Sequence, residues 1–144
     1  LECVCVMHEN DPLAVKRLIS PTDLAGRSIV AITGQHMVDR QLDGLLTAAG
    51  VIVERHISSY FFAIARNIIA VGNELAIIDP TNGKANLNDG VTWRPFAPRV
   101  NHEMAIITPS DQPLGQAAGG LYDLITQSLQ RLTNPSDTGG ADAR

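Results

Sequence analysis

The stretch from residue 27 to residue 50 restricts the possible folds more than any other part of this sequence. It opens with a run of mostly β-branched apolar residues, 28–32, which is typical of a strand buried on both faces. Apolar residues then recur at helical spacing, which predicts a helix over residues 37–49 that ends at Gly50. The residues between them, Thr33-Gly34-Gln35, are therefore expected to form the turn from strand to helix.

A turn of this kind is a candidate ligand site. It directs free backbone N–H groups, and the positive end of the helix dipole, beyond the carboxyl end of the strand. Ligands of open α/β sheets bind at that edge. The alternative is that Thr33 only caps the following helix, and this stretch taken by itself favours the capping role.

The alternation of strand and helix continues along the chain. A strand is expected over residues 51–57, then a helix over residues 60–71 with Ser58 and Ser59 at its N-cap, then a strand over residues 74–78. This order indicates a parallel sheet with crossover helices. Because the helix over residues 60–71 is apolar almost all round, we expect it to be covered on most faces.

The two ends of the chain add further elements. A strand is expected over residues 2–7, and two more over residues 91–96 and 103–107. A last helix begins near Pro113 and carries one apolar stripe. Residues 134–144 are small and polar, which predicts a disordered tail.

Composition and motif content argue against several kinds of site. The formal net charge is -4 and aromatic residues make up 4% of the chain, which is unfavourable for a nucleic-acid-binding surface. Cys3 and Cys5 are expected to point to opposite faces of a strand, and the histidines are scattered singly, so no metal site is expected. Asp79 follows a strand, but Pro80 beside it favours a turn-forming role.

Catalysis and membrane association are not expected either. The sequence has no nucleophile–base constellation, Walker loop or dinucleotide fingerprint, which indicates a protein that is not an enzyme and has no catalytic residues or cofactor. No apolar stretch approaches membrane-spanning length, and no secretory signal opens the chain. A cytoplasmic protein is therefore expected.

Four motifs occur in the order found in one known family. They are Asp11-Pro12-Leu13-Ala14, Asp23-Leu24-Ala25-Gly26, the run from Val71 to Ile78, and Arg94-Pro95-Phe96-Ala97-Pro98. With the pattern of strands and helices between them, they resemble the effector-binding domain of LysR-type transcriptional regulators over residues 1–132. The Asp79-Pro80 pair and the Arg94 motif look most like members that sense amino acids or opines. Two departures are Asp11, where the family has His, and Asn73-Glu74, where it has an apolar residue and Gly.

The resemblance implies an α/β fold like that of type II periplasmic-binding proteins, in which a small effector is held between two subdomains. It assigns residues 1–107 mainly to the second subdomain, residues 108–133 to a helix that returns to the first, and residues 134–144 to the tail. It also implies that Thr33, Gly34 and Gln35 line the cleft, with Ser58 at the next turn. Together with the helix N-terminus, these residues would suit a carboxylate or similar polar anion.

The expected function is effector sensing within a LysR-type regulator, with a small polar or carboxylate metabolite, amino-acid-like, as the effector. Partners implied by the family are further copies of the chain, as a dimer or tetramer, and DNA only through an N-terminal helix-turn-helix. That domain would lie in about 140 to 160 residues that precede Leu1. Alternatives from other classes are a solute-binding protein and a small α/β enzyme of similar fold.

Overall fold

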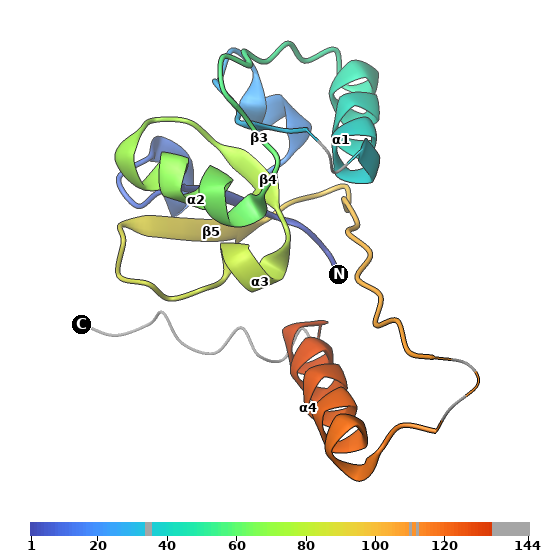
Figure 1. The fold of residues 1–144 in the computed structure, drawn as a ribbon. Helices are drawn as coiled ribbons and strands as arrows, with labels where there is room; N and C mark the ends of the chain where they lie inside the picture. Colours follow the sequence, from blue (N-terminus) through green and yellow to red (C-terminus); the bar gives the residue numbers. More distant parts are fainter. Residues whose placement is uncertain (34–35, 110, 112, 134–144) are drawn as a thin grey trace. The chain divides into compact units, whose positions relative to one another are not determined.

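The computed structural model describes residues 1–33, 36–109, 111 and 113–133. The chain divides into two compact units, Leu1–His102 and Glu103–Arg144 (Figure 1). The first unit contains all the strands of the described residues, and the second contains one long helix. Each unit is described by itself.

The sheet of the first unit is mixed. β1 (Val4–His8) pairs antiparallel with both β4 (Ala76–Ile78) and β5 (Val91–Pro95), while β2 (Ala31–Ile32) pairs parallel with β3 (Ser58–Ser59). A parallel bridge between Ile29 and Leu75 joins the three-stranded and the two-stranded parts. The resulting order is β3-β2-β4-β1-β5, in which β1 alone runs against its neighbours.

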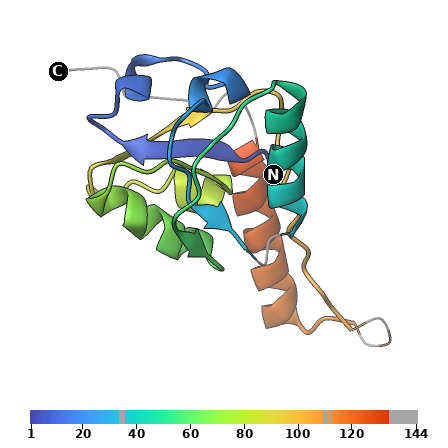
Figure 2. The same cartoon turned by 90° about the horizontal axis from the view of Figure 1, so that it is seen from above.

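The two crossover helices follow the predicted alternation. α1 (His36–Ala48) leads from β2 to β3, and α2 (Phe62–Val71) leads from β3 to β4. Because β3 and β4 lie on opposite sides of β2 in the sheet, right-handed crossovers place the helices on opposite faces, and Figure 2 shows α1 and α2 on different sides of the strands. The predicted parallel arrangement with crossover helices is therefore confirmed for β2, β3 and β4.

The core explains why these segments form strands. The side chains of β1 from Val4 to Met7 are all at most 4% exposed, and Ile29, Val30 and Ile32 are equally buried. A run buried on both faces needs apolar residues at every position, not at alternate ones. This is the pattern that the sequence shows in both places.

Several predicted boundaries differ from the structure. The strand expected over residues 51–57 runs beside residues 26–31 through bonds such as Ile29 N–H to the Glu54 carbonyl (2.8 Å), but its regular part is Ser58–Ser59. α2 begins at Phe62 instead of residue 60, with Phe61 and not a serine as its N-cap. Residues 103–107 were expected to be a strand, and this was wrong: they have no regular structure.

Within this chain α2 is covered on one face only, so the chain itself does not provide the cover expected on most faces. Phe62, Ala65, Arg66 and Ile69 are buried, which is one stripe at helical spacing. On another side of the same segment, Phe61 is 64% exposed, Ile64 49% and Val71 89%. One apolar face of α2 therefore lies in solvent in this chain.

Short helices occupy the connections. The 3-10 helices η1 (Pro12–Val15) and η2 (Pro21–Leu24) lie between β1 and β2, and α3 (Pro80–Gly83) follows β4 directly. Asp79 caps α3, because its carboxylate accepts hydrogen bonds from the N–H groups of Thr81 (2.9 Å) and Asn82 (3.1 Å). This is the turn-forming role expected from the sequence.

The second unit contains α4 (Gln116–Thr133), close to the start predicted near Pro113. Its apolar residues include Leu121, Leu124 and Ile125, which are exposed. The predicted tail over residues 134–144 lies outside the described residues. Among the helices that the structure describes, none is both long enough and apolar enough to cross a membrane.

Candidate functional site

The ends of β2 and β3 lie side by side at the carboxyl edge of the sheet. The parallel register places Ile32 opposite Ser59, so that the chain leaves both strands at the same level. Thr33, half-buried, directs its hydroxyl to the Ser59 carbonyl at 3.5 Å. That distance is at the long end for a hydrogen bond, so the hydroxyl is only weakly engaged. Gly34 and Gln35, the other predicted site residues of this turn, lie outside the described residues.

Ser59 shapes the second turn. Its side chain is buried, accepts from the Phe61 N–H (3.2 Å) and donates to the Phe61 carbonyl (2.9 Å). The hydroxyl thus folds the chain back before α2 instead of capping the helix. Because Phe61 is the N-cap and has no polar side-chain atom, the first-turn N–H groups of α2 receive no cap from it.

Ser58, the fourth predicted site residue, is exposed and lies in β3, opposite Ala31 of β2. Side chains of successive strand residues point to opposite faces, so Ser58 and Ser59 differ in direction. Ser59, and not Ser58, has its backbone in contact with Thr33. A pair of adjacent serines in sequence does not reveal which one faces the neighbouring turn; the strand register decides that.

The start of α1 is tied to the end of β2. Asp39, in the first turn of α1, directs a carboxylate oxygen to the Ile32 N–H at 3.4 Å. An acidic side chain in the first turn also favours the helix through its dipole. The contact holds the beginning of α1 close to the residue that precedes Thr33.

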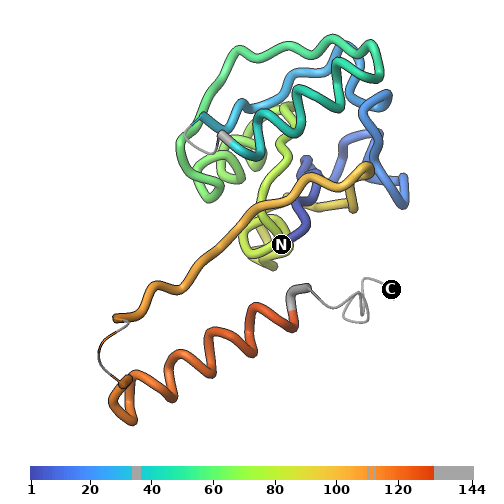
Figure 3. The backbone as a smooth tube through the Cα atoms, turned by 90° about the vertical axis from the view of Figure 1, so that its right-hand side faces the viewer, coloured from blue at the N-terminus to red at the C-terminus, as the bar shows by residue number. Residues whose placement is uncertain are grey.

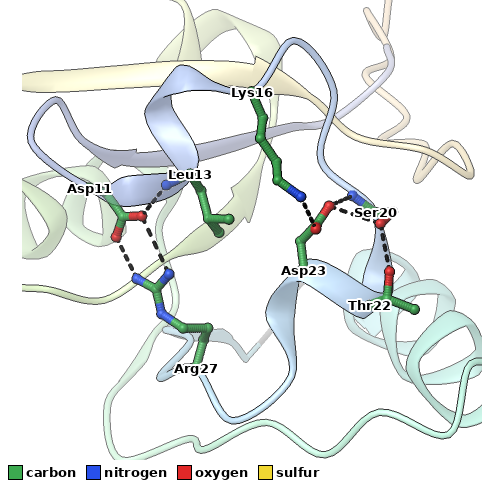
Figure 4. A network of polar contacts seen from close by, with 7 residues as sticks. All are labelled: Asp11, Leu13, Lys16, Ser20, Thr22, Asp23 and Arg27. Carbon is green, nitrogen blue, oxygen red and sulfur yellow. Dashed lines mark hydrogen bonds and ion pairs between the residues drawn. The ribbon is translucent and has the colours of Figure 1, made fainter.

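The opposite end of β2 carries a different polar cluster, drawn in Figure 4. Asp11 caps η1 by accepting from the Leu13 N–H (2.8 Å), and it forms an ion pair with Arg27. The hydrogen bond from Lys16 holds the pKa of Asp23 below its usual value. Asp11 and Asp23 come from two of the family-like motifs, and both serve the local fold.

A shallow pocket of about 380 Å³ lies at this same end. Its lining consists of His8, Asn10, Asp11, Pro12, Arg27 and Asn73. The Arg27 charge is already balanced by Asp11. The pocket includes neither Thr33 nor Ser59, and the chemistry of the turns makes the carboxyl edge the better candidate site.

The cysteines do not form a reactive or metal-binding site. Burial raises the pKa of both Cys3 and Cys5 to about 12, which keeps the thiols protonated. Among the residues that the structure describes, no group of His, Cys, Asp and Glu could hold a metal ion.

A family model, the LysR substrate binding domain, matches residues 1–130. This chain belongs to that family. Regulatory protein NocR of Agrobacterium tumefaciens (strain T37) is 28% identical over 129 residues, covering 90% of this chain and 43% of NocR. Transcriptional activator protein LysR of Escherichia coli (strain K12) is 27% identical, covering 96% of this chain and 47% of that protein. The chain spans less than half the length of these curated relatives.

Solved structures agree on the fold. The regulatory domain of CcmR from Synechocystis PCC6803, in complex with 2-PG, has a TM-score of 0.60 and 15% sequence identity, covering 88% of this chain and 62% of that chain. At this identity the likeness concerns the fold. The resemblance to LysR-type effector domains, and the α/β fold of the periplasmic-binding-protein kind that it implies, are confirmed.

Proposed function

We propose that this domain senses a small polar or carboxylate metabolite, amino-acid-like in character, for a LysR-type transcriptional regulator. The effector binds at the turn Thr33-Gly34-Gln35 and at the turn between β3 and α2, with Ser58 nearby. The observation that carries the proposal is the contact of the Thr33 hydroxyl with the end of β3, at Ser59, three residues before α2 begins without a side-chain cap.

The chemistry of this edge suits an anion. The first N–H groups of a helix lack partners within the helix and carry the positive end of its dipole, worth about 0.3 to 1 kcal/mol toward a negative group. The one proton of the Thr33 hydroxyl is donated to the Ser59 carbonyl over a long, weak bond, so a carboxylate could take that proton in place of the carbonyl. The bound 2-PG in the CcmR regulatory domain supports a small-molecule effector here as well.

The wider setting follows from the relatives. NocR and LysR are named as regulators, which supports a protein that is not an enzyme, works in the cytoplasm and binds DNA through an N-terminal helix-turn-helix. The domain self-associates as a dimer or tetramer. In this proposal, residues 1–107 belong to the second effector subdomain, and the helix within residues 108–133 belongs to the first.

The test is the substitution Thr33→Val, which keeps the shape of the side chain and removes the hydroxyl. Calorimetric titration would use a panel of free L-amino acids together with 2-PG. Each compound would be added to this chain and to a full-length regulator that contains it. For a compound that binds, we expect Thr33→Val to weaken binding by about 1 to 3 kcal/mol, because a buried polar group of the effector loses its partner.

Thr47→Val is the matched control, because Thr47 is exposed on α1 near the end distant from the turn. It should leave affinity unchanged. If Thr33 serves only as a helix cap, Thr33→Val lowers the free energy of unfolding by roughly 1 kcal/mol and leaves affinity intact. That outcome would overturn the site assignment.

A further inference from the structure

One side chain of α1 binds the backbone of the last segment of the first unit. The Gln41 amide donates from Nε2 to the Asn101 carbonyl (2.9 Å) and accepts through Oε1 from the Asn101 N–H (2.9 Å). A primary carboxamide can do both at once because it carries a donor and an acceptor side by side. Gln41 therefore acts on Asn101 as a neighbouring strand would.

α2 contacts the next residue of the same segment. The ring of Phe62 meets the ring of His102 edge to face, with centroids 5.1 Å apart and planes at 82°. Phe62 is 8% exposed, so its position is defined by the core. Edge-to-face pairs contribute beyond the area they bury.

The start of the chain holds the segment from a third direction. The Cys3 N–H donates to the Val100 carbonyl (2.8 Å), and Leu1 and His102 exchange backbone hydrogen bonds (2.9 and 2.8 Å). Figure 3 shows the N-terminus of the chain beside the backbone of this later segment. We call residues 100–102 the exit strand, because the second unit begins at the following residue. The exit strand is thus hydrogen-bonded to the first residues and to α1, and its His102 ring packs against α2.

The helices that hold the exit strand are the ones that begin at the candidate ligand turns. α1 follows the Thr33 turn, with Gln41 less than two helical turns from its first residue, and Phe62 is the first residue of α2. A packed helix moves largely as a unit, so a shift at either turn is carried to the bonded partner. Through Gln41 and Phe62, that partner is the exit strand.

We propose that Gln41 and Phe62 are positioning residues that couple the two ligand turns to the direction in which the exit strand leaves the first unit. The proposal rests on the proposed function for the identity of the turns. Glu at position 41 would keep an acceptor for the Asn101 N–H but place a carboxylate oxygen against the Asn101 carbonyl. The pair of bonds therefore requires an amide at this position.

The test is amide hydrogen exchange at Asn101 and His102 in the full chain, read by NMR. Gln41→Ala, which removes the acceptor of the Asn101 N–H, should accelerate exchange at Asn101 by about fivefold, the effect of losing one hydrogen bond worth about 1 kcal/mol net. Gln41→Glu should accelerate exchange by less, because an acceptor remains but the carboxylate repels the Asn101 carbonyl. Thr47→Ala on the same helix should change nothing at Asn101. Core amides of α1, such as Leu42 and Leu46, should be unaffected in all three variants, which separates this effect from general destabilisation.

A second arm measures the coupling itself. Thr33→Val removes the hydrogen bond between Thr33 and Ser59. In the otherwise unchanged chain, it should change the rates of amide hydrogen exchange at Asn101 and His102. The same substitution in the Gln41→Ala background should alter Asn101 much less. Phe62→Leu, which keeps the core apolar, should reduce the response of His102 in the same way.

Either of two results would overturn the coupling: exchange at Asn101 indifferent to Gln41, or a Thr33→Val response of equal size in both backgrounds. Neither result depends on finding an effector. Failure of the proposed function is recognised separately, as unchanged affinity of Thr33→Val for a compound of the panel that binds. The coupling can therefore stand or fall by itself.

Discussion

The thiols of Cys3 and Cys5 differ from those of an exposed cysteine in one measurable property. Burial raises the pKa of each from 9.0 to about 12, so the neutral form is favoured in the folded state. The contribution to stability is present below pH 9 and is lost as the pH rises from 9 toward 12. Iodoacetamide at pH 8 should therefore leave both thiols unmodified, and alkylation should follow the urea unfolding curve in mass spectrometry. Rapid modification of the folded chain would contradict the burial of these residues.

Arg66 is a buried charge that holds a loop in place. Its guanidinium donates to Asp89 through Nε (3.1 Å) and Nη2 (2.9 Å), and through Nη1 to the carbonyls of Asn82 and Gly83 (3.0 Å each). Lysine cannot reproduce this fork. We expect Arg66→Lys to lower the free energy of unfolding by about 2 to 3 kcal/mol in urea titrations followed by circular dichroism.

The pairing of Arg66 with Asp89 also predicts that the free energy of unfolding depends on pH in the acid range. Burial by itself would raise the pKa of Asp89, but the hydrogen bonds and charge of Arg66, together with backbone hydrogen bonds such as that from the Val91 N–H, outweigh it and hold the pKa below its usual value. Stability from this carboxylate is therefore present above its unfolded pKa and is lost as the pH falls through the lower folded value. This loss should shrink in Arg66→Lys. Arg55→Lys, at the exposed pair with Asp43, is the control and should cost less than about 0.5 kcal/mol.

At the scale of elements, local patterns were sufficient where the chain repeats one period. The run of apolar residues before Thr33 predicted the end of β2 at Ile32, and the helical spacing after it predicted both ends of α1 to within a residue. The predicted start of the strand, at residue 28, lies three residues before β2, where Ser28 and Ile29 form isolated bridges only. Residues 103–107 have a strand-like composition but no strand. A strand forms only against a hydrogen-bonding neighbour, and composition does not state whether one is present.

The candidate site likewise has one part that could be predicted from the sequence and one part that could not. Thr33 at the end of β2 could be located from sequence, because the turn follows from the change of period. The contact of Thr33 with Ser59 depends on the register of two parallel strands, and the bonds of Gln41 to Asn101 span 60 positions along the chain. Such contacts are set by tertiary packing, so local pattern does not predict them.

Alanine should change the stability in opposite directions at two glycines, Gly44 inside α1 and Gly50 just after its end. Gly50 ends the helix with φ +65, where the Gly50 N–H bonds to Thr47 (3.0 Å) and the Val51 N–H to Leu46 (2.9 Å). A Cβ would meet nothing within 4 Å there, so the cost of Gly50→Ala is conformational, about 1 kcal/mol. Gly44 lies inside α1 and also has free space, so Gly44→Ala should stabilise by about 0.5 to 1 kcal/mol. Thermal melting should show a lower melting temperature for Gly50→Ala and a higher one for Gly44→Ala. A change in the same direction for both variants would contradict the ending of α1 at Gly50.

At the scale of the whole molecule, the two ends of β2 have different tasks. The polar groups near its beginning are engaged with one another, as in the ion pair of Asp11 with Arg27. Near its end, Thr33 makes a long hydrogen bond to Ser59, and α2 begins without a polar side-chain cap. Under the proposed function, an anionic effector would bind at this end of β2 and would shift the domain toward the conformation that it binds better.

The exposed apolar face of α2 leads to the last prediction, which concerns self-association. Phe61, Ile64 and Val71 follow one another at helical spacing and are 64%, 49% and 89% exposed. Contiguous apolar surface of this kind usually marks a contact with another protein surface. We expect the chain to form a dimer or larger assembly, and Ile64→Glu to weaken it, because a carboxylate buried at the contact would lose its hydration.

Sedimentation velocity over a range of concentrations, with light scattering for mass, measures this association. Glu9→Gln is a suitable control, because it changes charge at an exposed residue distant in sequence from α2. The circular dichroism of Ile64→Glu should match that of the unchanged chain, since Ile64 contributes little to the core. A chain that remains monomeric at high micromolar concentration, with or without the substitution, would show that the exposed face of α2 does not mediate self-association.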